Sequence, residues 1–156
     1  MITVMEGKSH LRRYAIHPSG VWARVENGEL LYAPLIVVVD EARAHIYLSG
    51  QMARDQRGLI ASSDMRNQIS TVCANIGKCL EYVGANFDDV VSTVTHVLDL
   101  KEYYAASDER FKYFKHTRPA STLVQVSALG SPEAKIEITA EAIMEVSRLV
   151  VAEEAI

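Results

Sequence analysis

Apolar residues recur at steps of three and four positions between residues 65 and 83, which is the period of an α-helix. The members of this stripe are Met65, Ile69, Val72, Cys73, Ile76, Leu80 and Val83. Asp64 precedes the stripe, where a carboxylate can accept hydrogen bonds from free N–H groups, and Gly84 follows it, where helices commonly end. The pattern predicts an amphipathic helix of about five turns.

A second helix is predicted over residues 100–116. Its stripe consists of Tyr104, Phe111 and Phe114, with charged residues between them, and Pro119 stops it. Other segments are short and rich in β-branched and apolar residues, which is the composition of strands. These predicted strands are residues 35–39, 45–48, 90–98, 122–129 and 135–143.

Turn residues predict how neighbouring strands connect. Asn27-Gly28 predicts a tight hairpin between residues 21–25 and 30–33. Gly130-Ser131-Pro132-Glu133 separates the last two predicted strands and predicts a second hairpin. Residues 1 to about 20 have weak periodicity, so we expect an arm or a short edge element there.

The order of these elements predicts an α+β fold, in which a mixed sheet carries two helices packed on one face. No repeat or linker divides the chain, so we expect one domain, with residues 1–33 as an N-terminal extension and residues 34–150 as the main part. Several predicted strands have apolar residues at both odd and even positions, so both faces of the sheet should be apolar. One layer of helices covers only one of these faces. We therefore expect the second face to be buried against copies of the chain in a closed homo-oligomer.

Composition narrows the class of partner. The 156 residues are 49% hydrophobic and 23% charged, with a formal net charge of −4. This acidic balance argues against nucleic acid as a partner, because binding to phosphates depends on basic surface. No segment reaches the roughly eighteen apolar residues of a membrane span, and the first residues lack the apolar core of a signal peptide. We expect a cytoplasmic protein that binds no membrane.

Glu137 is the first candidate for chemistry. It lies between Ile136 and Ile138, so its carboxylate must be solvated in a cleft, paired with a cation, or held partly protonated. An ion pair with Lys135, or with Arg118 of a neighbouring chain, is the structural alternative to a role in a site.

Other reactive residue types carry weaker signals. The histidines show no metal-ligand spacing, so we expect no metal site. No glycine-rich phosphate loop is present either. Cys73 and Cys79 are six positions apart in the first predicted helix, on different sides of the cylinder. We interpret both as small buried apolar groups.

From Pro34 onward the chain resembles the Rid family, the YjgF-like reactive-intermediate deaminases with a chorismate-mutase-like fold. The matching pieces are Ile46-Tyr47-Leu48-Ser49-Gly50-Gln51, Asn75-Ile76, the run from Val91 to Leu100 that ends in Leu98-Asp99-Leu100, Pro119-Ala120, and Ile136-Glu137-Ile138. The resemblance implies a homotrimer whose sheets assemble into a barrel, with clefts at the subunit interfaces. It also implies hydrolysis of small imines or enamines to a ketone and ammonia, without a cofactor.

Family site residues can be carried over one at a time. Gly50 matches the family's glycine, whose backbone, with that of Ser49, would stabilise developing negative charge, and Glu137 matches the glutamate that orients or activates water. The arginine that clamps a substrate carboxylate directly after Pro-Ala is replaced by Ser121.

The remaining predicted site residues lie around that substitution. Ser121 or Thr122 would contribute hydrogen bonds, and Leu123 stands where many members have a cysteine. Arg118 is the nearest replacement for the clamp, and its alternative role is to complement a helix dipole.

Two functions from different classes follow. The first is a hydrolytic deaminase. The second is a non-catalytic trimer that binds a small metabolite or protects other proteins, and the loss of the arginine supports it. Nucleolytic activity, known for some relatives, is disfavoured by the acidic balance and the lack of a basic aromatic stripe.

Overall fold

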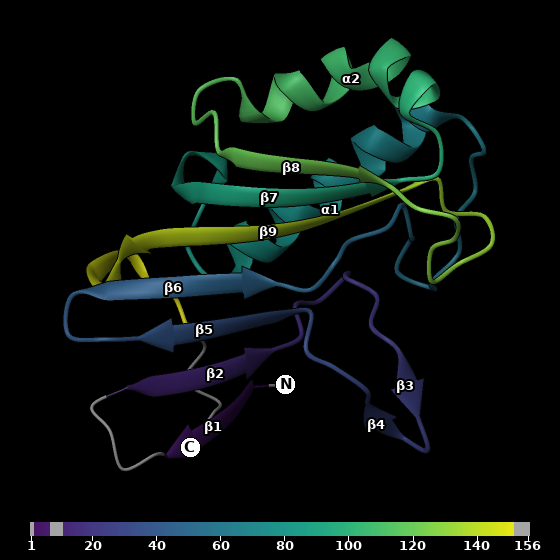
Figure 1. Ribbon diagram of the computed structural model, residues 1–156. Helices are drawn as coiled ribbons and strands as arrows, with labels where there is room; N and C mark the ends of the chain where they lie inside the picture. Colours follow the sequence, from purple (N-terminus) through teal and green to yellow (C-terminus); the bar gives the residue numbers. More distant parts are fainter. Residues whose placement is uncertain (1, 7–10, 152–156) are drawn as a thin grey trace.

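A mixed sheet of seven strands, in the order β1-β2-β5-β6-β9-β7-β8, forms the frame of the molecule (Figure 1). The structure is a computed structural model that describes residues 2–6 and 11–151. The strands of this sheet are β1 (Ile2–Glu6), β2 (Arg12–Ile16), β5 (Leu35–Val39), β6 (Arg43–Leu48), β7 (Val90–Val97), β8 (Ala120–Gln125) and β9 (Ile136–Glu145). The other elements are the small strands β3 (Val25–Glu26) and β4 (Glu29–Leu30), the helices α1 (Met65–Tyr82) and α2 (Leu100–Phe114), and the 3₁₀ turns η1 (Phe87–Asp89) and η2 (Val146–Arg148).

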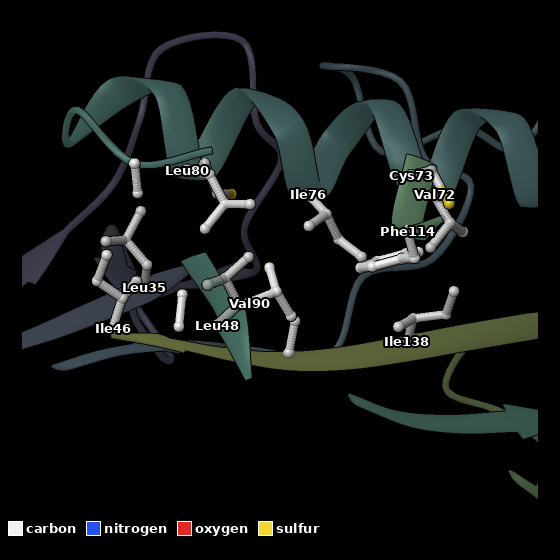
Figure 2. Close-up of a cluster of buried hydrophobic side chains, with 14 of the residues drawn as sticks. Leu35, Ile46, Leu48, Val72, Cys73, Ile76, Leu80, Val90, Phe114 and Ile138 are labelled. Carbon is white, nitrogen blue, oxygen red and sulfur yellow. The ribbon is translucent and has the colours of Figure 1, made fainter. Parts of the chain in front are cut away.

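Helix α1 forms as its sequence predicts. The Asp64 carboxylate accepts a hydrogen bond from the Asn67 N–H at 2.9 Å, and Gly84 adopts a positive φ of 82° after the last turn. Figure 2 shows the apolar stripe of the helix, including Ile76 and Leu80, pointing toward the sheet, where these side chains are fully buried. The hydrophobic effect therefore joins α1 to the sheet along its whole length.

Both helices cover the same face of the sheet, as predicted. In β9 the side chains of Ile136, Ile138 and Ala140 are buried beneath the helices, whereas the alternating Glu137 and Thr139 are only half-buried. Figure 1 shows α1 behind β7 and β9. We call the opposite side of the sheet the open face. Its residues in the central and β8-edge strands include Tyr47, Val94, His96, Thr122, Val124, Glu137, Thr139, Glu141 and Ile143.

The predicted hairpin between the last two strands is wrong, because β7 lies between β8 and β9. Strand β8 pairs with β7 in parallel after the α2 crossover, and β9 pairs with β7 in the antiparallel sense. The connecting loop crosses the end of β7, where the Val126 N–H binds the Val97 carbonyl at 2.9 Å and the Leu98 N–H binds the Lys135 carbonyl at 3.1 Å. The Gly130–Glu133 turn chemistry belongs to this longer loop.

The N-terminal segment adds to the opposite edge of the sheet. Strands β1 and β2 pair with each other, and β2 pairs with β5, which agrees with the predicted edge element. Residues 1 and 7–10 of that segment lie outside the described part of the chain. The Asn27-Gly28 turn forms with φ angles of 53° and 82°, but its strands, β3 and β4, are two residues each and shorter than predicted. The boundary at residue 33 between extension and main part stays a prediction.

Cys73 and Cys79 are both fully buried on α1, which confirms that they are small core groups. Burial disfavours the charged thiolate and raises the pKa of each thiol to about 12. Among residues 2–6 and 11–151, no cluster of His, Cys, Asp and Glu could hold a metal ion. In the same ranges, no helix is long and apolar enough to cross a bilayer.

Replacing Asp64 by alanine should lower the free energy of unfolding by about 1 kcal/mol, because the Asn67 N–H loses its acceptor at the start of α1. Urea denaturation followed by circular dichroism measures the change. The control is Ser63→Ala at the exposed neighbouring position, which should change stability by less than about 0.5 kcal/mol. Equal effects of the two substitutions would contradict the capping role.

Both native cysteines should resist a thiol reagent such as dithionitrobenzoate at pH 8 in the folded protein. With a pKa of about 12, each buried thiol holds on the order of one part in 10⁴ of thiolate at that pH. Absorbance at the thionitrobenzoate maximum should rise only when urea unfolds the chain. A Lys78→Cys variant, at an exposed position of α1, should react in the native state. Rapid labelling of the unmodified folded chain would refute the prediction.

Candidate active site

An open cavity of about 530 Å³ lies where the N-terminal segment, the chain after β6 and the start of β9 meet. Its lining residues are Trp22, Arg24, Leu31, Tyr32, Ser49, Gly50, Met52, Arg54, Gly130 and Glu137. Three predicted site residues, Ser49, Gly50 and Glu137, are therefore brought together, although they are far apart in the sequence. The volume is within the range of small-molecule sites.

Gly50 and Glu137 approach each other closely in the lining of the cavity. Gln51 and Ile138 exchange backbone hydrogen bonds of 2.9 and 3.0 Å, which ties the chain after β6 to β9. A Cβ at position 50 would lie only 2.8 Å from Cδ of Glu137. Glycine is thus required for the carboxylate of Glu137 to lie over this backbone.

Within the described part of the chain, the carboxylate of Glu137 forms no hydrogen bond or ion pair. Lys135, one of the two cations expected to pair with it, instead forms an ion pair with Glu102. The cross-strand neighbour of Glu137 in the open face is His96 of β7. The Glu137 carboxylate is consequently available to a ligand in the cavity.

Ser49 positions the backbone of the site. Its hydroxyl donates to the Ala33 carbonyl at 2.7 Å, and its N–H donates to the Pro34 carbonyl at 2.8 Å. The N–H of Gln51 donates to the Ile138 carbonyl. Between them, the Gly50 N–H has no acceptor among the described residues and can donate to a ligand.

The loop over residues 52–63 is held in place from α1. The buried Asn75 side chain donates to the backbone carbonyls of Met52 at 3.2 Å and Arg54 at 2.9 Å. Within the loop, the Asp55 carboxylate accepts N–H bonds from Arg57 and Leu59, and the bond from Leu59 is the main reason that the pKa of Asp55 is lowered. The backbone position of Arg54 is therefore set by the hydrogen bond from Asn75 and by the bonds that the neighbouring Asp55 accepts within the loop.

Arg54 is a cationic wall of the cavity that the sequence analysis missed. Its Nη1 donates to the Gly58 carbonyl at 2.7 Å, and its guanidinium carbon lies 4.2 Å from the centre of the Trp22 ring. Its Nε is buried without a hydrogen-bond partner among the described residues. The available signals were the single tryptophan and an arginine four positions after Gly50, but neither has a recognisable spacing.

The charges in the cavity are unevenly neutralised. Arg24 pairs with Glu26 at 2.6 Å in a largely exposed ion pair. Arg54 forms no ion pair within the described residues, although it contributes to the lowered pKa of Glu133, which results chiefly from a hydrogen bond donated by Ser131. The cavity thus holds one unpaired guanidinium and one unpaired carboxylate.

The predicted residues of β8 lie outside this cavity. In the sheet register Ser121, Thr122 and Leu123 face residues 93–95 of β7, whereas Glu137 lies on the other side of that strand. Arg118 follows α2 with a φ of 47°, and its N–H donates to the Phe114 carbonyl at 3.0 Å. A shared site for these residues and Glu137 stays a prediction.

Comparisons with known proteins agree with this fold. The family model described as Endoribonuclease L-PSP matches residues 32–144. The human 2-iminobutanoate/2-iminopropanoate deaminase is 32% identical over 108 residues, which cover 69% of this chain and 76% of that protein. A RutC family protein of Pyrococcus abyssi is 33% identical over 85 residues, covering 54% of this chain and 67% of that protein.

A solved structure gives the same result for the architecture. YyfA of Yersinia pestis, described as a member of the conserved Rid protein family, superposes with a TM-score of 0.71 at 25% identity, over 83% of this chain and 98% of that chain. The family match covers most of the chain, including the segments of Gly50 and Glu137. On these grounds, the chain belongs to the Rid/YjgF family, whose family model is described as Endoribonuclease L-PSP.

Proposed function

We propose that this protein hydrolyses small imines or enamines to a carbonyl compound and ammonia, in the cavity formed by Gly50 and Glu137. The observation that carries the proposal is the unpaired Glu137 carboxylate next to the unused Gly50 N–H. A relative that is 32% identical is named as a deaminase of 2-imino acids, which supports the same class of reaction.

Glu137 would act on the water that attacks the imine. The water oxygen bonds to the imine carbon while Glu137 accepts a proton from it, and the electrons of the C=N double bond move to nitrogen. Glu137 returns that proton to nitrogen. The resulting carbinolamine loses its hydroxyl proton as C=O forms and the C–N bond breaks, and ammonia leaves with this proton.

Gly50 would contribute through its backbone. An N–H that is already oriented and unpaired costs no reorganisation when it stabilises negative charge developing on oxygen. An enamine first takes a proton on its carbon to become the imine and then follows the same path. Glu137 is the group in the cavity suited to deliver that proton, since a carboxyl group can act as both acid and base.

Glu137→Gln should reduce kcat by 10²-fold or more, because the amide cannot accept the proton of water. The imine is generated in situ by an amino acid oxidase, and its loss is followed by competition with semicarbazide. Glu141→Gln is the matched control, since Glu141 lies on the same strand and face but outside the cavity. An unchanged rate for Glu137→Gln would remove Glu137 from the mechanism.

We also propose that three copies of the chain bury the open face, as the family resemblance implies. Tyr47, Val124 and Ile143 on this face are 44%, 40% and 39% exposed in the single chain, which is a large apolar surface to leave in water. Such an assembly would bring β8 of one subunit toward the cavity of another. Of the predicted residues, Arg118 and Thr122 could then line a site at each interface, whereas the register places Ser121 and Leu123 on the helix-covered side of β8.

Sedimentation equilibrium should give a mass three times the 17.3 kDa of one chain. Val124→Asp places a charge on the open face and should shift the mass toward the monomer. Leu59→Asp, at a 55% exposed position in the 52–63 loop, should leave the trimer intact. A monomeric wild-type protein would overturn the proposed assembly.

The alternative is a non-catalytic member that binds a metabolite or protects other proteins. Ser121 in place of the clamping arginine favours it, because a hydroxyl cannot form a bidentate contact with a carboxylate. Protein that binds 2-oxo acids but hydrolyses no imine would support this alternative. A cytoplasmic location and the lack of a nucleic-acid partner stay predictions from the sequence.

A further inference from the structure

Arg54 has the properties of an anion-binding residue within the cavity. Nη1 of its guanidinium is used by the Gly58 carbonyl, which leaves the edge formed by Nε and Nη2. This edge presents two parallel N–H groups, the arrangement that receives both oxygens of a carboxylate. Nε is buried and has no partner among the described residues, so an acceptor that reached this edge would satisfy a donor that is otherwise left unpaired.

The guanidinium is also held in a fixed orientation. Trp22 lies against its plane at 4.2 Å, and Asn75 holds the backbone carbonyl of Arg54 at 2.9 Å. Gly58 permits the stacking, since a Cβ at that position would lie 2.8 Å from Cε2 of Trp22. An oriented cation binds a carboxylate with a smaller entropic cost than a flexible one.

Apolar side chains form another part of the cavity wall. Leu31 and Tyr32, from the N-terminal segment, are 55% and 37% exposed there, and Met52 lies beside them in the lining. A volume of about 530 Å³ exceeds what a carboxylate and an imine alone would fill. The apolar part of the lining, which a carboxylate and an imine would leave uncovered, is suited to an apolar substituent of the substrate.

We propose that Arg54 binds the substrate carboxylate, and that Leu31 and Tyr32 favour 2-imino acids with a bulky apolar side chain. The inference rests on the proposed function and specifies its substrate. Arg54 would form the contact with the carboxylate that Ser121 cannot form. It lies in a different segment from Ser121 and in the same chain as Glu137. The imine nitrogen, positively charged when protonated, would face the Glu137 carboxylate.

The test compares Arg54→Met with Arg57→Met. Arg57 lies in the same loop but pairs with Asp55 outside the cavity. The substrates are the imines of leucine, of alanine, and of 3-methylbutylamine, which lacks the carboxylate. Arg54→Met should raise KM for the leucine imine on the order of 10- to 100-fold and affect the amine-derived imine far less, because only the first has a carboxylate to lose. Arg57→Met should match the wild type on all three.

A binding measurement separates this inference from the proposed function. Titration calorimetry with 4-methyl-2-oxopentanoate should show binding by the wild type and by Arg57→Met, with loss in Arg54→Met. Arg54→Lys keeps the charge without the planar fork and should bind with intermediate affinity. Leu31→Ala should reduce the preference for the leucine imine over the alanine imine. Circular dichroism spectra confirm that each variant is folded.

The outcomes are distinguishable. Arg54-dependent binding of the oxo acid without turnover supports the anion site while the deaminase proposal fails. Turnover of the leucine imine that Arg54→Met and Arg54→Lys leave unchanged overturns the anion site while the deaminase proposal stands. Equal losses on substrates with and without a carboxylate also overturn it, because they indicate a structural role. A wild type that neither binds the oxo acid nor hydrolyses the imines overturns both.

Discussion

The alternation of side chains along β9 is the constraint on which the site depends. Ile136 and Ile138 are fully buried beneath the helices, and each contributes on the order of 1.5–3 kcal/mol by leaving water. Because side chains of a strand alternate between faces, Glu137 must point to the open face. A slip of one residue would expose both isoleucines and bury the carboxylate without a partner, so the core also determines where the acid lies.

Two buried amides on α1 link that core to the loops around the cavity. Asn75 binds the backbone of the 52–63 loop, and Gln68 binds the carbonyls of Ser62 and Glu133 and the N–H of Lys135. Both side chains are buried, so losing their partners would leave desolvated polar groups at a cost of about 1–3 kcal/mol each. The helix that supports the sheet therefore also orders the cavity wall that carries Arg54.

Much of the local structure was predictable because it rests on short-range rules. The apolar period and Asp64 predicted α1, and Asn27-Gly28 predicted the turn between β3 and β4. Pairing of the last two strands was not predictable in the same way. Turn residues between residues 122–129 and 135–143 indicate a reversal of the chain, but they do not indicate that β7 occupies the space between the two strands. Strand order depends on contacts between distant segments, and here the α2 crossover places β8 parallel to β7.

The sequence by itself determined the helix α1, the apolar phase of β9, and the candidacy of Glu137 and Gly50, since each follows from local pattern or from the family resemblance. Only the tertiary structure decided that Gly50 lies against Glu137, and that Trp22 and Arg54 meet beside them. The physical reason is that no periodicity connects these residues. Their proximity results from the Gln51–Ile138 backbone pairing and from the hydrogen bonds of Asn75, which join parts of the chain that lie far apart in the sequence.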